Sequence, residues 1–115
     1  MITAAACADP CSNTTIAEVP SPSGEFNAVV FDRGCGATTG FSTQVSLLRR
    51  GERLSNTGGN ALVVDAGHAP LPLQVQAEWL SDGVLRLAYD PRLRTFTKES
   101  AVSGVTLIHA PSSSR

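Results

Sequence analysis

Alternation of apolar and polar residues with a period of two is the main pattern of this chain. The clearest case runs over residues 73–80, which read LQVQAEWL, and a second runs over 41–49, which read FSTQVSLLR. A period of two places alternate side chains on opposite faces of a strand, and this mixture indicates a sheet with one solvent-exposed face. No window longer than about ten residues repeats apolar side chains at helical spacing. The pattern therefore predicts an all-β chain with no substantial helix.

The predicted strands are separated by turns rich in glycine and proline. Residues 25–32 (EFNAVVFD) carry apolar side chains on both faces, which is typical of a central strand covered on both sides. Residues 20–24 (PSPSG) carry turn chemistry, and Asp82-Gly83 is a hairpin signal. Residues 92–102 are polar and irregular, and we expect no strand there. The predicted strands cover 14–19, 25–32, 41–49, 61–66, 73–80, 84–89 and 104–109.

This rhythm of short strands predicts a small antiparallel sandwich or open barrel of about seven strands. At 115 residues the chain has the length of one domain. We expect residues 14–110 to form that β domain, after a flexible arm over 1–13 that includes a possible signal remnant, and before a disordered tail over 111–115. The expected core comprises Val30, Phe31, Val45, Leu47, Val63, Val75, Trp79, Leu85, Leu87 and Leu107.

Charge and hydropathy argue against a nucleic-acid partner and against a transmembrane helix. The net charge is −1, and basic residues do not cluster beyond Arg49, Arg50 and Arg53. The chain therefore lacks the basic patch of a nucleic-acid-binding protein, and we expect no nucleic-acid partner. No apolar run reaches the length that a transmembrane helix needs. Nothing in the motifs asks for a cofactor, and none is expected.

The three cysteines, Cys7, Cys11 and Cys35, suggest one pair and one spare residue in an exported protein. Cys11 precedes the first predicted strand and Cys35 follows the second, so a hairpin of the two strands brings these cysteines together. We therefore predict a Cys11–Cys35 disulfide, worth roughly 3 kcal/mol by constraining the unfolded chain. Cys7 follows three alanines, as at a lipoprotein cleavage site, and is the only membrane tether expected. The alternative is three reduced cysteines in a cytoplasmic protein.

Cys35 also carries the alternative of a cysteine nucleophile. It would need a base, and the only histidines are His68 and His109. Arg33 would favour the thiolate, and the flanking glycines would free backbone N–H groups for an oxyanion. The glycine-rich run 34–40 (GCGATTG) is followed by a predicted strand rather than a helix, which argues against a phosphate-binding loop. Nothing in this spacing requires catalysis, and we expect no enzyme.

Metal-ligand spacing is weak throughout the chain. Asp65 and His68 are three residues apart, and the three cysteines with one histidine would make a further loose set of ligands. Structural zinc sites need four well-placed cysteine or histidine ligands. We therefore predict no metal site.

Polar, uncharged side chains mark the predicted recognition surface. Ser42, Gln44 and Ser46 alternate along one strand, and we expect them beside Gln74, Gln76 and Glu78 on one sheet face that binds a protein or a glycan. Together with the cysteine loop, the predicted binding residues are Arg33, Thr38, Thr39, Ser42, Gln44 and Ser46.

The stretch CGATTGFSTQVSLL at 35–48, preceded by SPSGEFNAVVFDRG and followed later by WLSDGVLRLAYD, carries a resemblance. It resembles a group of small uncharacterised bacterial envelope proteins, many of which look like lipoproteins. The resemblance covers roughly residues 11–109 and implies an exported context and a cysteine pair. It implies no activity, so no catalytic residue carries over.

We expect a non-enzymatic envelope binding module for a protein or glycan partner, possible forms being an inhibitor or an immunity protein, with a periplasmic or envelope location. A cytoplasmic location is the alternative. Two other function classes stay open: a cysteine-dependent hydrolase or redox protein using Cys35 with His68 or His109, and a self-associating structural protein whose edge strands pair.

Overall fold

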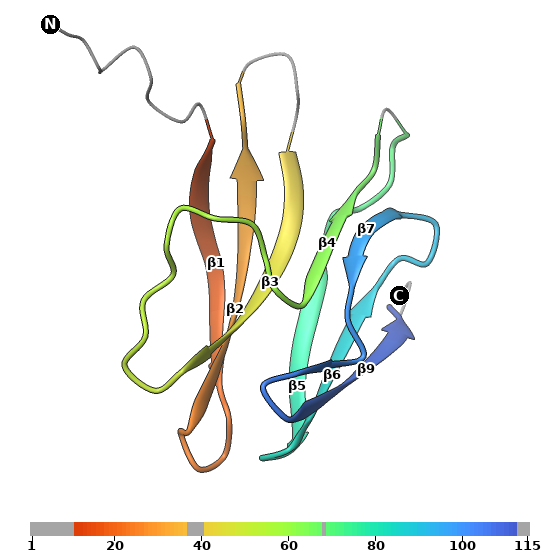
Figure 1. The fold of residues 1–115 in the computed structure, drawn as a ribbon. Coiled ribbons are helices and arrows are strands. Elements are labelled where there is room, and N and C mark those ends of the chain that lie inside the picture. Colours follow the sequence, from red (N-terminus) through yellow and green to blue (C-terminus); the bar gives the residue numbers. More distant parts are fainter. Residues whose placement is uncertain (1–10, 37–40, 68, 113–115) are drawn as a thin grey trace, which may run out of the picture.

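The computed structural model describes residues 11–36, 41–67 and 69–112, and these form two packed β-sheets without a helix (Figure 1). The first sheet has the order β1-β2-β3-β4-β7 and the second β5-β6-β9-β8. This sandwich-like arrangement confirms the predicted all-β class. The strands are β1 (Ser12–Pro20), β2 (Phe26–Gly34), β3 (Phe41–Arg49), β4 (Leu62–Asp65), β5 (Val75–Ser81), β6 (Val84–Tyr89), β7 (Arg94–Lys98), β8 (Ala101–Val102) and β9 (Val105–Pro111).

The predicted boundaries of the β domain need two small corrections. Ser12 and Asn13, assigned to the flexible arm, are the first residues of β1, and Pro111, assigned to the tail, is the last residue of β9. Residues 1–10 and 113–115 lie outside the described residues.

The segment 92–102, predicted to be irregular, contains β7 and β8. β7 pairs with β4 at the edge of the first sheet, with Leu62 opposite Lys98. β8 and β9 form a hairpin around Ser103 and Gly104, whose φ angles of 52° and 83° are those of a type I′ turn. β7 shows no apolar alternation because nearly all of its side chains are exposed, on both faces of the strand, and this is why the pattern missed it.

One strand pair runs in the opposite sense to the prediction. β9 pairs with β6 in parallel, from Val84 opposite Thr106 to Tyr89 opposite Pro111, whereas an antiparallel fold was expected. The chain leaves the second sheet after β6 to add β7 to the first sheet, and it then returns through the β8–β9 hairpin. Periodicity reports which face a residue occupies but not the direction of its neighbour, so it carried no signal for this pair.

The main core lies between the sheets, and β2 is covered on both sides as predicted. Ala28 and Val30 belong to the core between the sheets, whereas Val29 and Phe31 pack with Leu48 on the outer face of the first sheet. Most of the predicted core residues are buried, and Val75 and Trp79 are half-buried against that core. Val63 was assigned to the wrong face of β4, because its neighbours Leu62 and Val64 are the fully buried residues.

The outer face of the first sheet is not solvated across β3. The connection from β3 to β4, drawn in yellow-green, crosses in front of this sheet (Figure 1). Val29, Phe31 and Leu48 form the outer cluster, and Leu54 from this connection packs on it. Gln44 and Ser46 on the same face are buried. The predicted solvent-exposed face of this strand is therefore corrected: its polar residues lie under a loop.

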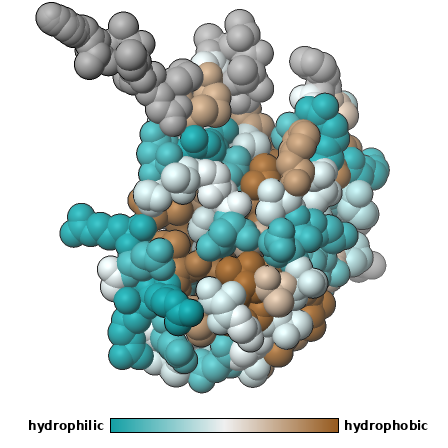
Figure 2. Space-filling model, in the orientation of Figure 1, coloured by the Kyte–Doolittle hydropathy of each residue, from teal (hydrophilic) through white to brown (hydrophobic). Residues whose placement is uncertain are grey.

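Exposed apolar side chains are scattered over the described surface. On the face drawn in Figure 2 they reach the surface in separate pieces divided by hydrophilic side chains. The large apolar side chains with the most exposure lie on five different strands and are Ile16, Phe41, Leu80, Phe96 and Ile108.

Candidate functional site

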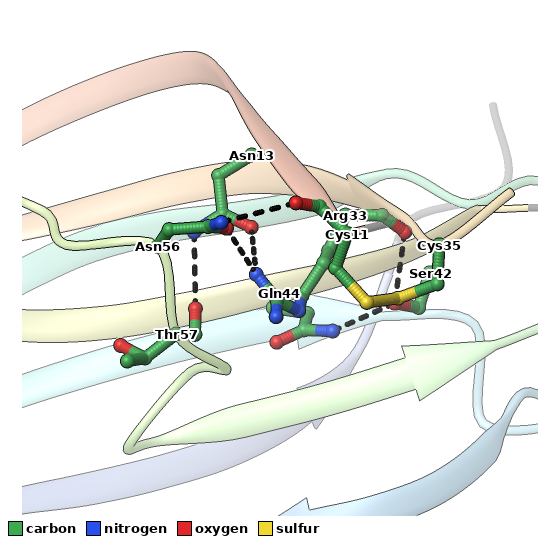
Figure 3. Close-up of a disulfide and its surroundings, with 8 residues drawn as sticks. All are labelled: Cys11, Asn13, Arg33, Cys35, Ser42, Gln44, Asn56 and Thr57. Atoms are coloured by element: carbon green, nitrogen blue, oxygen red, sulfur yellow. Dashed lines mark hydrogen bonds between the residues drawn. A yellow bond between two sulfur atoms is a disulfide. The ribbon is translucent and has the colours of Figure 1, made fainter. Parts of the chain in front are cut away.

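A disulfide joins the start of β1 to the end of β2. The sulfur atoms of Cys11 and Cys35 are 2.03 Å apart, which confirms the predicted pair (Figure 3). The bond adds one covalent rung beyond the last pair of the β1–β2 ladder, Ser12 opposite Gly34. Its position follows from the hairpin register, because residues that flank the same end of two antiparallel strands face each other.

Arg33 and two asparagines tie this disulfide-bonded end to the β3–β4 connection (Figure 3). The Arg33 guanidinium donates from Nη1 to Oδ1 of Asn13 (2.8 Å) and to Oδ1 of Asn56 (2.9 Å). The Asn56 amide donates to the carbonyl of Cys11 (3.1 Å). The Asn13 amide donates to the carbonyls of residues 55 and 57 (3.1 and 3.0 Å). The middle of the connection is therefore fastened to β1 and β2.

The polar residues of β3 fasten the end of the same connection. Gln44 accepts a hydrogen bond at Oε1 from the Gly59 N–H (2.7 Å) and donates from Nε2 to the Ser42 hydroxyl (2.7 Å). Ser46 accepts at Oγ from the Asn60 N–H (3.3 Å). The residues predicted to bind a partner thus bind the protein's own backbone, which leaves the buried Gln44 amide satisfied.

The side-chain amide of Asn60 completes this attachment by hydrogen bonding to the β3 backbone, as the backbone of a neighbouring strand would. Its Oδ1 accepts from the Leu47 N–H (2.8 Å), and its Nδ2 donates to the Leu47 carbonyl (3.0 Å). The backbone at Gly59 lies so close that an added Cβ would be 2.6 Å from the Val45 carbonyl oxygen. Only glycine permits this approach. We call residues 51–60, held in this way, the clamped loop.

The clamped loop stays exposed although it is fastened at many points. Most of its side chains, including Arg53, Asn56 and Thr57, face solvent, while Leu54 is half-buried on the outer cluster. Among the described residues Arg53 has no hydrogen-bond or ion-pair partner. The combination is an ordered loop whose polar outer surface is open to a partner.

The structure brings together four of the predicted binding residues: Arg33, Gln44 and Ser46 bind the clamped loop, and Ser42 binds Arg33 and Gln44. Thr38, Thr39, Cys7 and His68 lie outside the described residues. Gln74, Gln76 and Glu78 belong to the second sheet or the segment before it, so they do not extend the polar face of β3 as predicted. The sequence pattern did not predict the roles of Asn13, Asn56 and Asn60. For Asn56 and Asn60 the signal was the asparagine- and glycine-rich run at 55–60.

Cys35 and His109, which the alternative cysteine mechanism would combine, lie at different sheets of the fold. The Cys35 sulfur is bonded to Cys11 and so carries no thiolate in this structure. His109 lies in the second sheet, with Nδ1 2.9 Å from the Tyr89 hydroxyl and Nε2 2.7 Å from the Glu99 carbonyl oxygen. Burial raises the pKa of the Tyr89 phenol, so this hydroxyl keeps its proton near neutral pH.

Two carboxylates close to β7 are each bound by an arginine. Asp65 accepts two hydrogen bonds from Arg94 (2.7 and 3.0 Å), and this partner lowers the pKa of Asp65. Arg92 binds Asp90 in the same manner and lowers its pKa to about 2. The part of the chain that the structure describes contains no group of three or more His, Cys, Asp or Glu side chains placed to hold a metal ion.

No protein-family model, curated protein or solved structure matches this chain. Within the described ranges, no helix has the length and apolar character needed to cross a membrane.

Proposed function

We propose that this protein is a non-enzymatic binding module of the bacterial cell envelope that recognises a protein partner with the clamped loop. The observation that carries the proposal is the ordering of an exposed loop by side chains of the scaffold. Arg33 and Gln44 of the first sheet each form a hydrogen bond with this loop, and Asn60 at the end of the loop binds the backbone of β3.

Ordering before binding is what makes such a loop useful for recognition. A flexible loop loses conformational entropy when a partner immobilises it, and that loss subtracts from the affinity. Here the loss occurs when the protein folds. The exposed side chains Arg53, Asn56 and Thr57 then offer a guanidinium, an amide and a hydroxyl from a fixed backbone. Loops held by a rigid sheet scaffold are common carriers of binding function.

A protein partner is favoured over a small molecule because Asn56 and Thr57 lie on the exposed outer surface of the loop, and the cavity that Glu52, Arg53 and Leu54 border holds about 240 Å³, less than the roughly 300 Å³ or more of a drug-sized ligand pocket. Small ligands bind in concave pockets that enclose most of their surface. The run 51–60 also contains no aromatic residue on which a sugar ring could pack, and this weakens the glycan alternative.

The Cys11–Cys35 disulfide supports the envelope location, because disulfides persist in the oxidising bacterial periplasm and are reduced in most cytoplasms. Asn56 of the clamped loop is held next to this bond, since its amide donates to the Cys11 carbonyl. A reducing compartment would therefore loosen the recognition loop itself.

Self-association by edge pairing receives less support. The edge strands of the first sheet, β1 and β7, each contain a bulge, at Ile16 and at Phe96, and β1 ends in Pro20. Bulges and prolines on edge strands are devices that prevent pairing with a second molecule.

The test is site-specific photo-crosslinking in cells that produce the protein. A photoreactive residue replaces Thr57 on the clamped loop or, as the matched control, the exposed Thr106 on β9. We expect a discrete cross-linked protein from position 57 and not from position 106. The captured partner, once purified, should bind the wild type and lose about tenfold or more in affinity to Thr57→Arg.

Equal cross-linking from both positions, or unchanged affinity of Thr57→Arg for the captured protein, would overturn the assignment of the loop. Catalytic turnover of a substrate by the wild type that persists in the Cys35→Ser variant would separately contradict a purely binding function. Localisation is read separately, by fractionating cells and alkylating free thiols before reduction.

A further inference from the structure

A second site lies where the edge of the first sheet meets the ends of two strands of the second. A cavity of about 170 Å³ opens there between β7 and the last residues of β6 and β9. It shares no lining residue with the clamped loop. Its walls are Tyr89, Pro91, Thr95, Lys98, His109, Ala110 and Pro111.

We propose that this cavity binds a monovalent carboxylate, with Lys98 as the cation that recognises it. The inference stands on the contents of the cavity and does not rest on the function proposed for the loop. Carboxylates are recognised by an ammonium or guanidinium group together with hydrogen-bond donors, and this cavity offers both.

Lys98 is the only lysine of the chain, and its charge is uncompensated. Among the described residues its ammonium has no hydrogen-bond or ion-pair partner. Glu99, which follows Lys98 in the chain, forms no ion pair with it and is not a lining residue of the cavity. Asp65 and Asp90 each bind an arginine through both carboxylate oxygens. No acidic side chain is among the described residues that line the cavity.

The remaining polar groups add donors next to this charge. Thr95 has a hydroxyl whose contact to the Leu93 carbonyl is long, at 3.5 Å, so it is free to turn towards a ligand. Pro91, Ala110 and Pro111 supply an apolar wall that keeps water from one side. One cation with neutral donors matches a single negative charge, whereas a phosphate dianion would leave a charge unpaired.

His109 fixes the hydrogen bonding of the Tyr89 hydroxyl at the wall of the cavity. Because a carbonyl oxygen can only accept, Nε2 carries a proton that it donates to the Glu99 carbonyl. In the neutral ring Nδ1 is then the acceptor for the Tyr89 hydroxyl. The charged and titratable groups lining the cavity are Lys98 from β7, Tyr89 from β6 and His109 itself.

The cavity is small and open to solvent at Lys98, so we expect a dissociation constant of about 1 mM for a simple acid. Its size suits a short acid or a single aspartate or glutamate side chain.

The test is a titration of the uniformly ¹⁵N-labelled protein with sodium propionate at constant ionic strength, followed by NMR. We expect saturable shifts at Thr95, Lys98 and Ala110, with binding about tenfold weaker in Lys98→Gln. The matched control is Arg53→Gln, which removes a basic side chain that has no hydrogen-bond or ion-pair partner among the described residues and should leave propionate affinity unchanged. Lys98 is exposed, so its substitution leaves the fold intact.

Two further arms make the result decisive. Sodium phosphate should bind more weakly than propionate, and tighter binding of phosphate would overturn the carboxylate assignment. The peptide acetyl-Ala-Glu-Ala-amide distinguishes the sources, since tighter binding than propionate assigns the site to an acidic side chain of a partner. Shifts that Lys98→Gln leaves unchanged would refute the proposal.

Discussion

Replacing both disulfide cysteines, as Cys11→Ser with Cys35→Ser, should destabilise the protein by an amount that depends on the length of chain that the disulfide closes. The bonded residues are 24 apart in sequence. In the chain-entropy model, closing a loop of this length removes about 12 cal/mol/K from the unfolded ensemble, which is about 3.5 kcal/mol at 25 °C. This is a large part of the total stability of a domain of this size.

The same change should loosen one end of the clamped loop and spare the other. Asn56 binds the carbonyl of Cys11, and Asn13 lies two residues further along β1, so these contacts depend on the disulfide-bonded end. Gln44 and Asn60 hold the loop through β3, which pairs with β2 along its whole length. Amide hydrogen exchange should therefore accelerate around residues 55–57 and stay slow at Gly59.

Urea unfolding followed by the fluorescence of Trp79, the only tryptophan, measures the loss directly. Cys7→Ser is carried in both the reference and the variant, so that no third thiol reshuffles the disulfide. The free energy of unfolding should fall by about 3.5 kcal/mol. The dependence on urea should steepen, because an unfolded chain without the cross-link exposes more surface.

A loss below about 1 kcal/mol would refute this reasoning. It would mean that the unfolded chain keeps the β1–β2 hairpin without the bond, so that the cross-link removes little entropy. Unchanged exchange at residues 55–57 would separately refute the claim that the disulfide supports the loop.

Three other substitutions test the loop and the carboxylates. Gly59→Ala should cost about 2 kcal/mol or more in thermal or urea unfolding, because its Cβ would lie 2.6 Å from a carbonyl oxygen of β3, whereas Gly83→Ala, with open space at that point, should stay within about 0.5 kcal/mol. Asn60→Ala should cost about 1–2 kcal/mol by leaving an N–H and a carbonyl of β3 unpaired, and a loss near zero would show that water replaces the amide. The pKa of Asp90 falls from its usual 3.8 to about 2 in the folded state, so its contribution is present above about pH 4 and is lost as the pH drops to about 2. Asp90→Asn should flatten the acid limb of a stability–pH profile, and an unchanged limb would contradict the pairing with Arg92.

Local chemistry predicted several features because each depends on residues close in sequence or on one strand. β2 was predicted as a doubly covered central strand, since its apolar side chains occupy both faces. The Cys11–Cys35 bond was predicted because the cysteines flank the two strands of a simple hairpin. The β5–β6 hairpin formed at the predicted Asp82-Gly83 turn.

The failures share a different cause. β7 and β8 were missed because a strand that pairs at an edge through its backbone needs little alternation of side chains. Val63 was assigned to the wrong face because four residues of β4 carry too few positions to decide the phase of the pattern. The cavity beside Lys98 combines residues from β6, β7 and β9, and no local pattern links them.

The polar alternation of β3 shows most clearly which features the sequence alone does not determine. By itself the sequence determined that this chain is a small β protein, which face most of its strands bury, and that two of its cysteines pair, because these depend on period and on nearest neighbours. Only the tertiary structure decided that Gln44 and Ser46 face a loop of the same chain rather than water, and that β9 lies parallel to β6. A polar side chain satisfied by the backbone and one satisfied by solvent have the same pattern in the sequence, and only the path of the folded chain distinguishes them.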